Sequence, residues 1–200
     1  KAEIMERDYG PRAEGWKRFL LQAYGQEFAE AVLKEARQQF EQFIPHIPYI
    51  GGDENALYTH QIIRAAEYLT FYKVMTSRGK TAQEVGKIIY GALEEFVRHL
   101  PEIPGSELTP EFREQRIALA KKSQERRYPD DWVWEYIEGD GVGFDYGTDY
   151  IECGAQKLYH AYDADEFLPF YCYLDFATHR TEGWGFMRTE TLSEDCLYLG

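Results

Sequence analysis

Residues 132–153 read WVWEYIEGDGVGFDYGTDYIEC, and this stretch decides the fold class. Aromatic side chains occupy every second position from Trp132 to Tyr136, and this two-residue period is typical of a β-strand. Gly139-Asp140-Gly141 has the composition of a hairpin turn. Residues 142–153 then form a returning strand that ends at Cys153. The sequence therefore predicts an antiparallel hairpin in a chain whose first half is helical.

Four helices are predicted before the hairpin. Apolar side chains recur at helical spacing over residues 14–44. A second helix runs over residues 54–78 and is ended by Gly79, which readily adopts a left-handed conformation. Thr81 and Glu84 form a capping box that opens a third helix. Thr109 followed by a proline begins a fourth, which extends to about residue 127. Short connections between such helices favour an antiparallel bundle or a related helical layer.

The residues after the hairpin are predicted to alternate between helices and strands. Helices are expected over residues 154–162 and 167–178, a strand over 183–192, and the start of another over 196–199. The predicted fold class is therefore α+β: an N-terminal helical bundle followed by a small antiparallel sheet with packed helices. We divide the chain into a helical region, 1–128, and a small α+β region that carries the cysteines, 129–200. The two regions are able to form one compact domain.

Composition narrows the class of partner. The net charge is −13 and the pI is about 4.9, whereas nucleic acid binding requires clustered lysine and arginine. No stretch approaches the ~18 consecutive apolar residues of a membrane span, and no signal peptide is visible. Three cysteines without a C-x-x-C pair make neither a disulfide framework nor a structural zinc site. We expect a cytoplasmic protein with a small-molecule partner, without nucleic acid or membrane binding; homo-oligomerisation stays open.

Cys172 and Asp175 are the most specific local feature of the sequence. Residues three apart on a helix share a face, and His179 falls on the same face if the helix continues. A thiol, a carboxylate and an imidazole together can form a nucleophile with its base, or part of a metal site. The alternative is a buried cysteine that packs as a small apolar side chain, with Asp175 capping a neighbouring element.

Two further positions are candidates for chemistry. Cys153 precedes a predicted helix, whose N-terminal dipole and N–H groups favour a thiolate; the alternative is a cysteine that fills a gap at the strand end. His60 and Glu67 share a face of the second helix and can form an acid–base pair; the alternative is an ordinary core or surface histidine. The common phosphate, dinucleotide, zincin and α/β-hydrolase motifs are absent from the sequence.

The last fifty residues resemble the L-2-amino-thiazoline-4-carboxylic acid hydrolase family. The features that carry the resemblance are a strand ending in Glu152-Cys153, a Pro-x-x-Cys-x-x-Asp pattern at Pro169, Cys172 and Asp175, an Arg-Thr-x-Thr-Leu string from Arg188 to Leu192, and a late Cys196. The helical half is similar more loosely, through Asn55, the long second helix, Arg78-Gly79 and the capped third helix. The resemblance covers most of the chain, and its specific part is the C-terminal third.

The resemblance implies a hydrolase that opens a small cyclic amidine bearing a carboxylate, without a cofactor or metal. In that reading Cys153 or Cys172 is the nucleophile, and Asp175 or His60 moves protons. Arg188 pairs with the substrate carboxylate, or is a plain strand residue. The substrate-binding set further comprises Thr189, Asn55 and Cys196. Two alternatives stay open: a metal-dependent enzyme that uses the cysteines with His60 or His179, and a non-catalytic small-molecule binding or sensor module.

Overall fold

The structure is a computed structural model that describes residues 4–99, 109–181 and 185–193. A π-helical turn, Met5–Tyr9, leads into the first helix. The helices are α2 (Gly10–Tyr24), α3 (Gln26–Phe43), α4 (Ala56–Thr76), α5 (Ala82–Arg98), α6 (Pro110–Ser123), α7 (Gly154–Ala161) and α8 (Leu168–Thr181), and the strands are β1 (Val133–Glu138) and β2 (Tyr146–Glu152). Short 3-10 turns at Ile44–His46, Gly52–Asn55 and Asp165–Phe167 connect some of these elements.

The first predicted helix is in fact two helices. The prediction of one helix over residues 14–44 is wrong because Gly25, with a φ of 81°, separates α2 from α3. Only glycine adopts this backbone conformation readily, and the chain turns there so that α2 and α3 pack against each other. Apolar periodicity did not reveal the break, since the apolar positions continue at helical spacing on both sides of it.

The other three helices of the first half are confirmed, together with their caps. Thr81 and Glu84 form the complete capping box at the start of α5. Thr109 accepts a hydrogen bond from the Phe112 N–H at 3.1 Å, and Pro110 is the first residue of α6. These caps satisfy N–H groups that have no partner within the helix.

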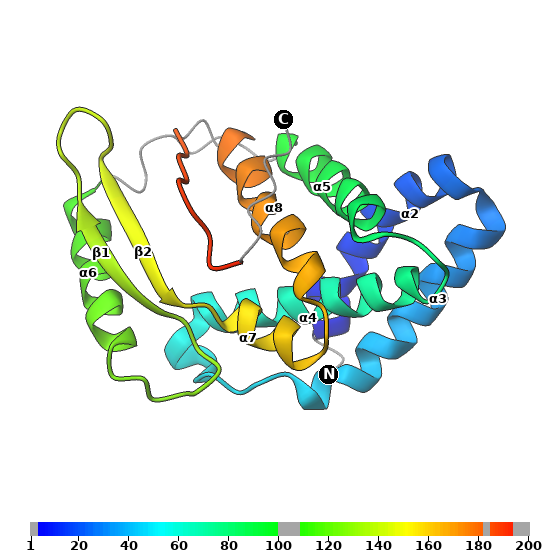
Figure 1. The fold of residues 1–200 in the computed structure, drawn as a ribbon, viewed down its shortest axis with the longest axis horizontal. Coiled ribbons are helices and arrows are strands. Elements are labelled where there is room, and N and C mark those ends of the chain that lie inside the picture. Colours follow the sequence, from blue (N-terminus) through cyan, green and yellow to red (C-terminus); the bar gives the residue numbers. More distant parts are fainter. Residues whose placement is uncertain (1–3, 100–108, 182–184, 194–200) are drawn as a thin grey trace.

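Helix α4 is the centre of the core. It crosses the molecule, with the hairpin and α6 at one end and α2 and α3 at the other (Figure 1). Trp16 of α2 stacks on Phe71 of α4 with ring centroids 4.4 Å apart. From the other side, Tyr159 of α7 donates a hydrogen bond to the Ala65 carbonyl at 3.1 Å. One hydrophobic cluster thus joins the helical region to the elements that follow the hairpin.

The hairpin forms as predicted, with a longer loop. Trp134 lies opposite Tyr150 and Tyr136 opposite Thr148 in an antiparallel ladder. The returning strand begins at Tyr146, not at residue 142, because the loop bonds to itself: the Asp140 carboxylate accepts hydrogen bonds from the N–H groups of Val142 and Gly143 at 2.9 and 2.6 Å. Those two residues are therefore unavailable to the ladder.

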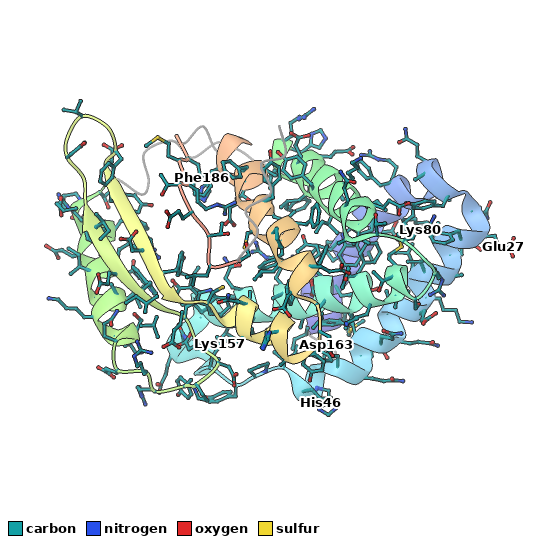
Figure 2. The ribbon with its side chains drawn as sticks, in the orientation of Figure 1. Glu27, His46, Lys80, Lys157, Asp163 and Phe186 are labelled. Atoms are coloured by element: carbon teal, nitrogen blue, oxygen red, sulfur yellow. The ribbon has the colours of Figure 1, made fainter. Side chains whose placement is uncertain are left out.

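The strand predicted over residues 183–192 is wrong for its described part, because residues 185–193 form no strand. Side-chain contacts with helices hold this segment: Arg188 bonds to α8, and Gln156 of α7 donates to the Leu192 carbonyl. Figure 2 shows Phe186 of the segment beside α8, and its ring centroid is 4.9 Å from that of Phe176. The strand predicted over 196–199 lies outside the described residues.

The fold class is α+β, with packed helices and a two-stranded antiparallel sheet. Within the described ranges, no helix is both long enough and apolar enough to span a bilayer.

Candidate functional site

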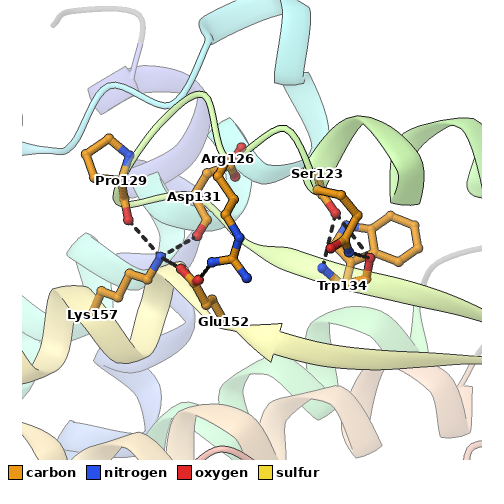
Figure 3. Close-up of polar contacts among 8 residues, drawn as sticks. Ser123, Arg126, Pro129, Asp131, Trp134, Glu152 and Lys157 are labelled. Atoms are coloured by element: carbon orange, nitrogen blue, oxygen red, sulfur yellow. Dashed lines mark hydrogen bonds and ion pairs between the residues drawn. The ribbon is translucent and has the colours of Figure 1, made fainter.

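Cys153 sits between the end of β2 and the start of α7, where it is the N-cap residue. Lys157, one turn into α7, fixes this junction. Its ammonium group donates hydrogen bonds to the Pro129 carbonyl at 2.7 Å and the Asp131 carbonyl at 3.0 Å, and pairs with Glu152 (Figure 3). Arg126 also pairs with Glu152. The segment before β1, the end of β2 and the start of α7 are thereby tied together around Cys153.

The expected thiolate at Cys153 is not favoured overall. Burial raises the pKa of the Cys153 thiol, while the N–H groups of Gln156 and Ala155 and the Trp132 side chain lower it. The charge of Asp175 raises the pKa further. Desolvation outweighs the helix terminus, so the prediction of a lowered pKa is wrong. Cys153 is a neutral thiol near pH 7 and needs a base before it can act as a nucleophile.

Asp175 is held by the segment that follows α8. The Arg188 guanidinium bonds to the Asp175 carboxylate at 3.1 Å and to the Cys172 carbonyl at 2.8 Å. It also lies 4.9 Å from the centroid of the Phe176 ring. Burial raises the pKa of Asp175, and the charges of Arg188 and Arg64 lower it. A carboxylate with a raised pKa is a better base than an ordinary one.

The Asp175 and Tyr150 side chains are partly exposed to solvent. The Asp175 side chain is 58% exposed and Tyr150 is 44% exposed, yet desolvation by surrounding protein raises the pKa of both groups. These two groups are coupled to others nearby, since the charges of Asp175 and Cys153 raise the pKa of Tyr150 and of Tyr171.

We define the tyrosine cluster as a set of groups that act electrostatically on one another across α4, β2, the residue before α7, and α8: Tyr58, Tyr150, Cys153, Tyr171 and Asp175. The charges of Arg64 and Arg116 also act on this cluster. Tyr171 donates a hydrogen bond to the Gln61 carbonyl at 3.3 Å, which fixes α8 on α4. The hydroxyl group of Tyr58 is buried, and its interaction with the Tyr150 hydroxyl raises the pKa of Tyr58 in addition to the larger effect of burial.

Comparison with known proteins identified no relative. No family model, curated protein or solved structure matches the chain.

Cys172 differs from Cys153 in its surroundings. It is half-buried and packs against the hydrophobic core, and the contact that links it to Asp175 runs through its own carbonyl and Arg188. His179, predicted on the same face, stacks on Phe186 with centroids 4.5 Å apart. Burial lowers the pKa of His179, and the Arg188 charge lowers it further. Both thiols raise the pKa of the buried Tyr159 between them.

The predicted acid–base pair of His60 and Glu67 is wrong. The two residues are seven positions apart on α4, about 10 Å along the helix axis. Glu67 is fully buried and pairs with Arg12, whereas His60 is exposed. Glu67 is therefore part of the ion pair that joins α2 to α4.

The predicted substrate-binding residues do not all belong to the tyrosine cluster. Asn55 donates hydrogen bonds to Asp131 at 2.7 Å and to the Ile50 carbonyl at 2.9 Å, so it joins the start of α4 to the segment before β1. The cavity that Asn55 helps to line has a volume of about 30 Å³, the size of a water molecule and too small for a substrate. Thr189 is exposed, and Cys196 lies outside the described residues.

Metal ligands do not gather in the part of the chain that the structure describes. Over residues 4–99, 109–181 and 185–193, no group of three or more His, Cys, Asp and Glu side chains is placed to hold an ion.

Sequence reasoning missed Arg64, Arg116, Tyr58 and Tyr150. One signal was available for Arg64, because it interrupts the apolar run Ile62-Ile63-Arg64-Ala65-Ala66 of a core helix. A charge at such a position is unusual unless it is paired or functional. The two tyrosines carried no signal among the sixteen in the sequence.

Proposed function

We propose that this protein is a cytoplasmic hydrolase that opens a small cyclic amidine bearing a carboxylate, as the resemblance to the L-2-amino-thiazoline-4-carboxylic acid hydrolase family implies. The observation that supports the proposal is that Cys153 and Asp175, which come from different elements, are within electrostatic reach of each other and of Tyr150. A thiol and a carboxylate of raised pKa have the composition of a nucleophile and its base.

The reaction adds one water molecule across one ring bond. The Asp175 carboxylate accepts a proton from the attacking group, either water or the Cys153 thiol, while that group bonds to the amidine carbon between sulfur and nitrogen. The adduct then releases the ring sulfur or the ring nitrogen, which takes the proton back from Asp175. Hydrolysis of the carbon–sulfur bond gives a urea and a free thiol; hydrolysis of the carbon–nitrogen bond gives a thiocarbamate and an amine. If Cys153 attacks, a second step transfers the carbon to water and restores the thiol.

The roles of the two thiols can be separated by matched substitutions. We expect Cys153→Ser to lose turnover of 2-aminothiazoline-4-carboxylate, measured by mass spectrometry of the ring-opened product. Cys172→Ser should retain most of it, because Cys172 packs against the core and its carbonyl, unchanged by the substitution, is the atom that Arg188 contacts. Thermal midpoints of both variants control for unfolding. Full activity of Cys153→Ser would exclude the thiol route and leave direct attack by water; no turnover by the wild-type protein would refute the hydrolase.

A non-catalytic binding module is the second candidate. The Arg116 Nε group is buried and has no hydrogen-bond partner among the described residues. It can receive an acceptor atom of a ligand without any reaction. Saturable binding of the same compound without product would favour this function over the hydrolase.

A further inference from the structure

Residues 185–193, which we call the strap, lie along α8 and are held there by side chains (Figure 1). The strap contains no helix or strand, and among the described residues no backbone–backbone hydrogen bond joins it to the rest of the chain. Phe186 and Arg188 are partly buried, whereas Met187 between them is 72% exposed. Few contacts therefore have to break for this part of the strap to leave α8.

The contacts of Arg188 define a cation site on α8. One NH2 group of its guanidinium, Nη1, donates to the Asp175 carboxylate at 3.1 Å and to the Cys172 carbonyl at 2.8 Å. The guanidinium carbon lies 4.9 Å from the centroid of the Phe176 ring, a distance at which the face of an aromatic ring attracts a cation. The carboxylate, the carbonyl and the ring all belong to α8, whereas the cation comes from the strap. The binding groups therefore stay together when the strap moves.

The strap also covers the cation that it supplies. The Arg188 side chain is 19% exposed, although the side chain of its partner Asp175 is 58% exposed. Phe186 of the strap contacts Phe176 with ring centroids 4.9 Å apart and stacks on His179 at 4.5 Å, and its own centroid is 5.7 Å from the guanidinium carbon. Ion pairs with this degree of solvent access contribute little to stability, so a cation from solution can compete with Arg188.

We propose that this α8 site binds a planar amidinium or guanidinium cation, and that Arg188 occupies the site while the strap is closed. A ligand amidinium carries an NH2 group of the same shape as that of Arg188, so it can bond to Asp175 and to the Cys172 carbonyl while it lies against Phe176. Binding displaces Arg188, which makes the strap an internal competitor of the ligand. The inference rests on the proposed function only for the ligand's identity: protonated 2-aminothiazoline is such an amidinium, and its amidine carbon is bonded to the nitrogen that Asp175 would hold.

Competition between the strap and a small cation tests the site. The probe is benzamidine, an amidinium without a ring bond for the proposed hydrolase to open, and the matched probe is benzamide, which is neutral and similar in shape. Both are titrated into the full chain and followed by ligand-observed NMR. We expect Arg188→Ala to bind benzamidine about 3- to 30-fold more tightly than the wild-type chain, because an exposed ion pair and a cation–π contact together favour the closed strap by about that factor. Binding of benzamide should not change.

Further variants assign the gain in affinity to the α8 site. Adding Asp175→Asn to Arg188→Ala should remove the gain, since it removes the charge that pairs with the cation. Phe186→Ala loosens the strap without changing Arg188 or the groups on α8 that bind it, and should give a smaller gain in the same direction. The matched control is Arg98→Gln, since Arg98 is an exposed residue of α5 paired with Glu94; it should bind benzamidine as the wild-type chain does.

The outcomes distinguish this site from the hydrolase itself. An equal gain for benzamide, or a gain that survives Asp175→Asn, would overturn the site. So would the absence of a gain in a folded Arg188→Ala chain, or in Phe186→Ala if Arg188→Ala does not fold. Each of these results would leave the hydrolase in place if the wild-type protein turns over 2-aminothiazoline-4-carboxylate. A gain that depends on Asp175, without product from the wild-type protein, would support the site and refute the hydrolase.

Discussion

The close contact between α5 and α8 gives a sharp test of how the fold positions the site. Gly86 of α5 faces Phe170 of α8, and a Cβ atom at Gly86 would lie 2.4 Å from Cδ1, 2.8 Å from Cγ and 3.0 Å from Cβ of Phe170. Rotation of the ring cannot relieve all three contacts, because Cβ and Cγ lie at the root of the side chain. We therefore expect Gly86→Ala to push α8 away from α5.

The expected change in the free energy of unfolding follows from two opposing effects. Alanine is favoured over glycine in a helix interior by about 1 kcal/mol, and overpacking a core costs about 1–3 kcal/mol. With three contacts at or below 3.0 Å, the upper part of that range applies, so Gly86→Ala should lower the free energy of unfolding by about 1–2 kcal/mol. Gly15→Ala in α2 is the matched control, since its Cβ would meet the Ala92 Cβ at an ordinary 3.4 Å. This control should gain up to about 1 kcal/mol.

Equilibrium unfolding in urea measures both variants against the wild-type chain. The two alanine variants should have midpoints on opposite sides of the wild-type value. Because α8 carries Asp175, Gly86→Ala should also reduce turnover more than its stability loss explains at low temperature. Equal midpoints for the two variants would show that α8 yields without cost, and the reasoning would fail.

Three further predictions concern the site and the helix caps. If Asp175 is the base, activity falls as the pH drops through its pKa, which burial raises above the usual 3.8. Arg188→Gln removes the largest charge that lowers this pKa, so the acidic limb of the kcat/KM profile should move to higher pH. An unmoved limb would exclude Asp175 as the base. Lys157→Met loses three acceptor contacts around Cys153. Charge-assisted hydrogen bonds contribute about 1.5–3 kcal/mol each, and because Lys157 is partly exposed, we expect the free energy of unfolding in urea to fall by about 2 kcal/mol in total. A loss below about 0.5 kcal/mol would contradict the role of this network. Thr81→Ala removes the capping box of α5 and should cost about 1 kcal/mol, with no effect on KM.

The charges of two arginines, Arg188 and Arg64, act on the Asp175 carboxylate. Asp175 receives a direct contact from Arg188 and a longer-range field from Arg64, and both lower its pKa against the effect of burial. Neutralising either arginine should therefore raise the pKa of Asp175.

Local sequence determined the elements of the fold and their ends. The capping box at Thr81, the proline after Thr109, the two-residue period before Gly139 and the helix after Cys153 all act over a few neighbouring residues, and all four are present in the structure. The two wrong predictions of secondary structure also have physical causes. Gly25 broke a helix whose apolar pattern continued through it, and residues 185–193 failed to form a strand because their partners are helix side chains.

The tertiary structure decided which groups face one another and what each group's charge state is. The sequence pointed to Cys153, Cys172 and Asp175, but it could not show that Arg188 would be committed to Asp175 or that Arg64 would form no ion pair within the described residues. The pKa of Cys153 illustrates the reason. The helix N-terminus after Cys153 is visible in the sequence, and its N–H groups lower the pKa of the thiol. Desolvation raises this pKa and outweighs the N–H groups, and it depends on how many distant residues pack around the sulfur. Local effects extend over one helical turn and can be read from neighbouring residues, while burial and long-range charge exist only once the chain is packed.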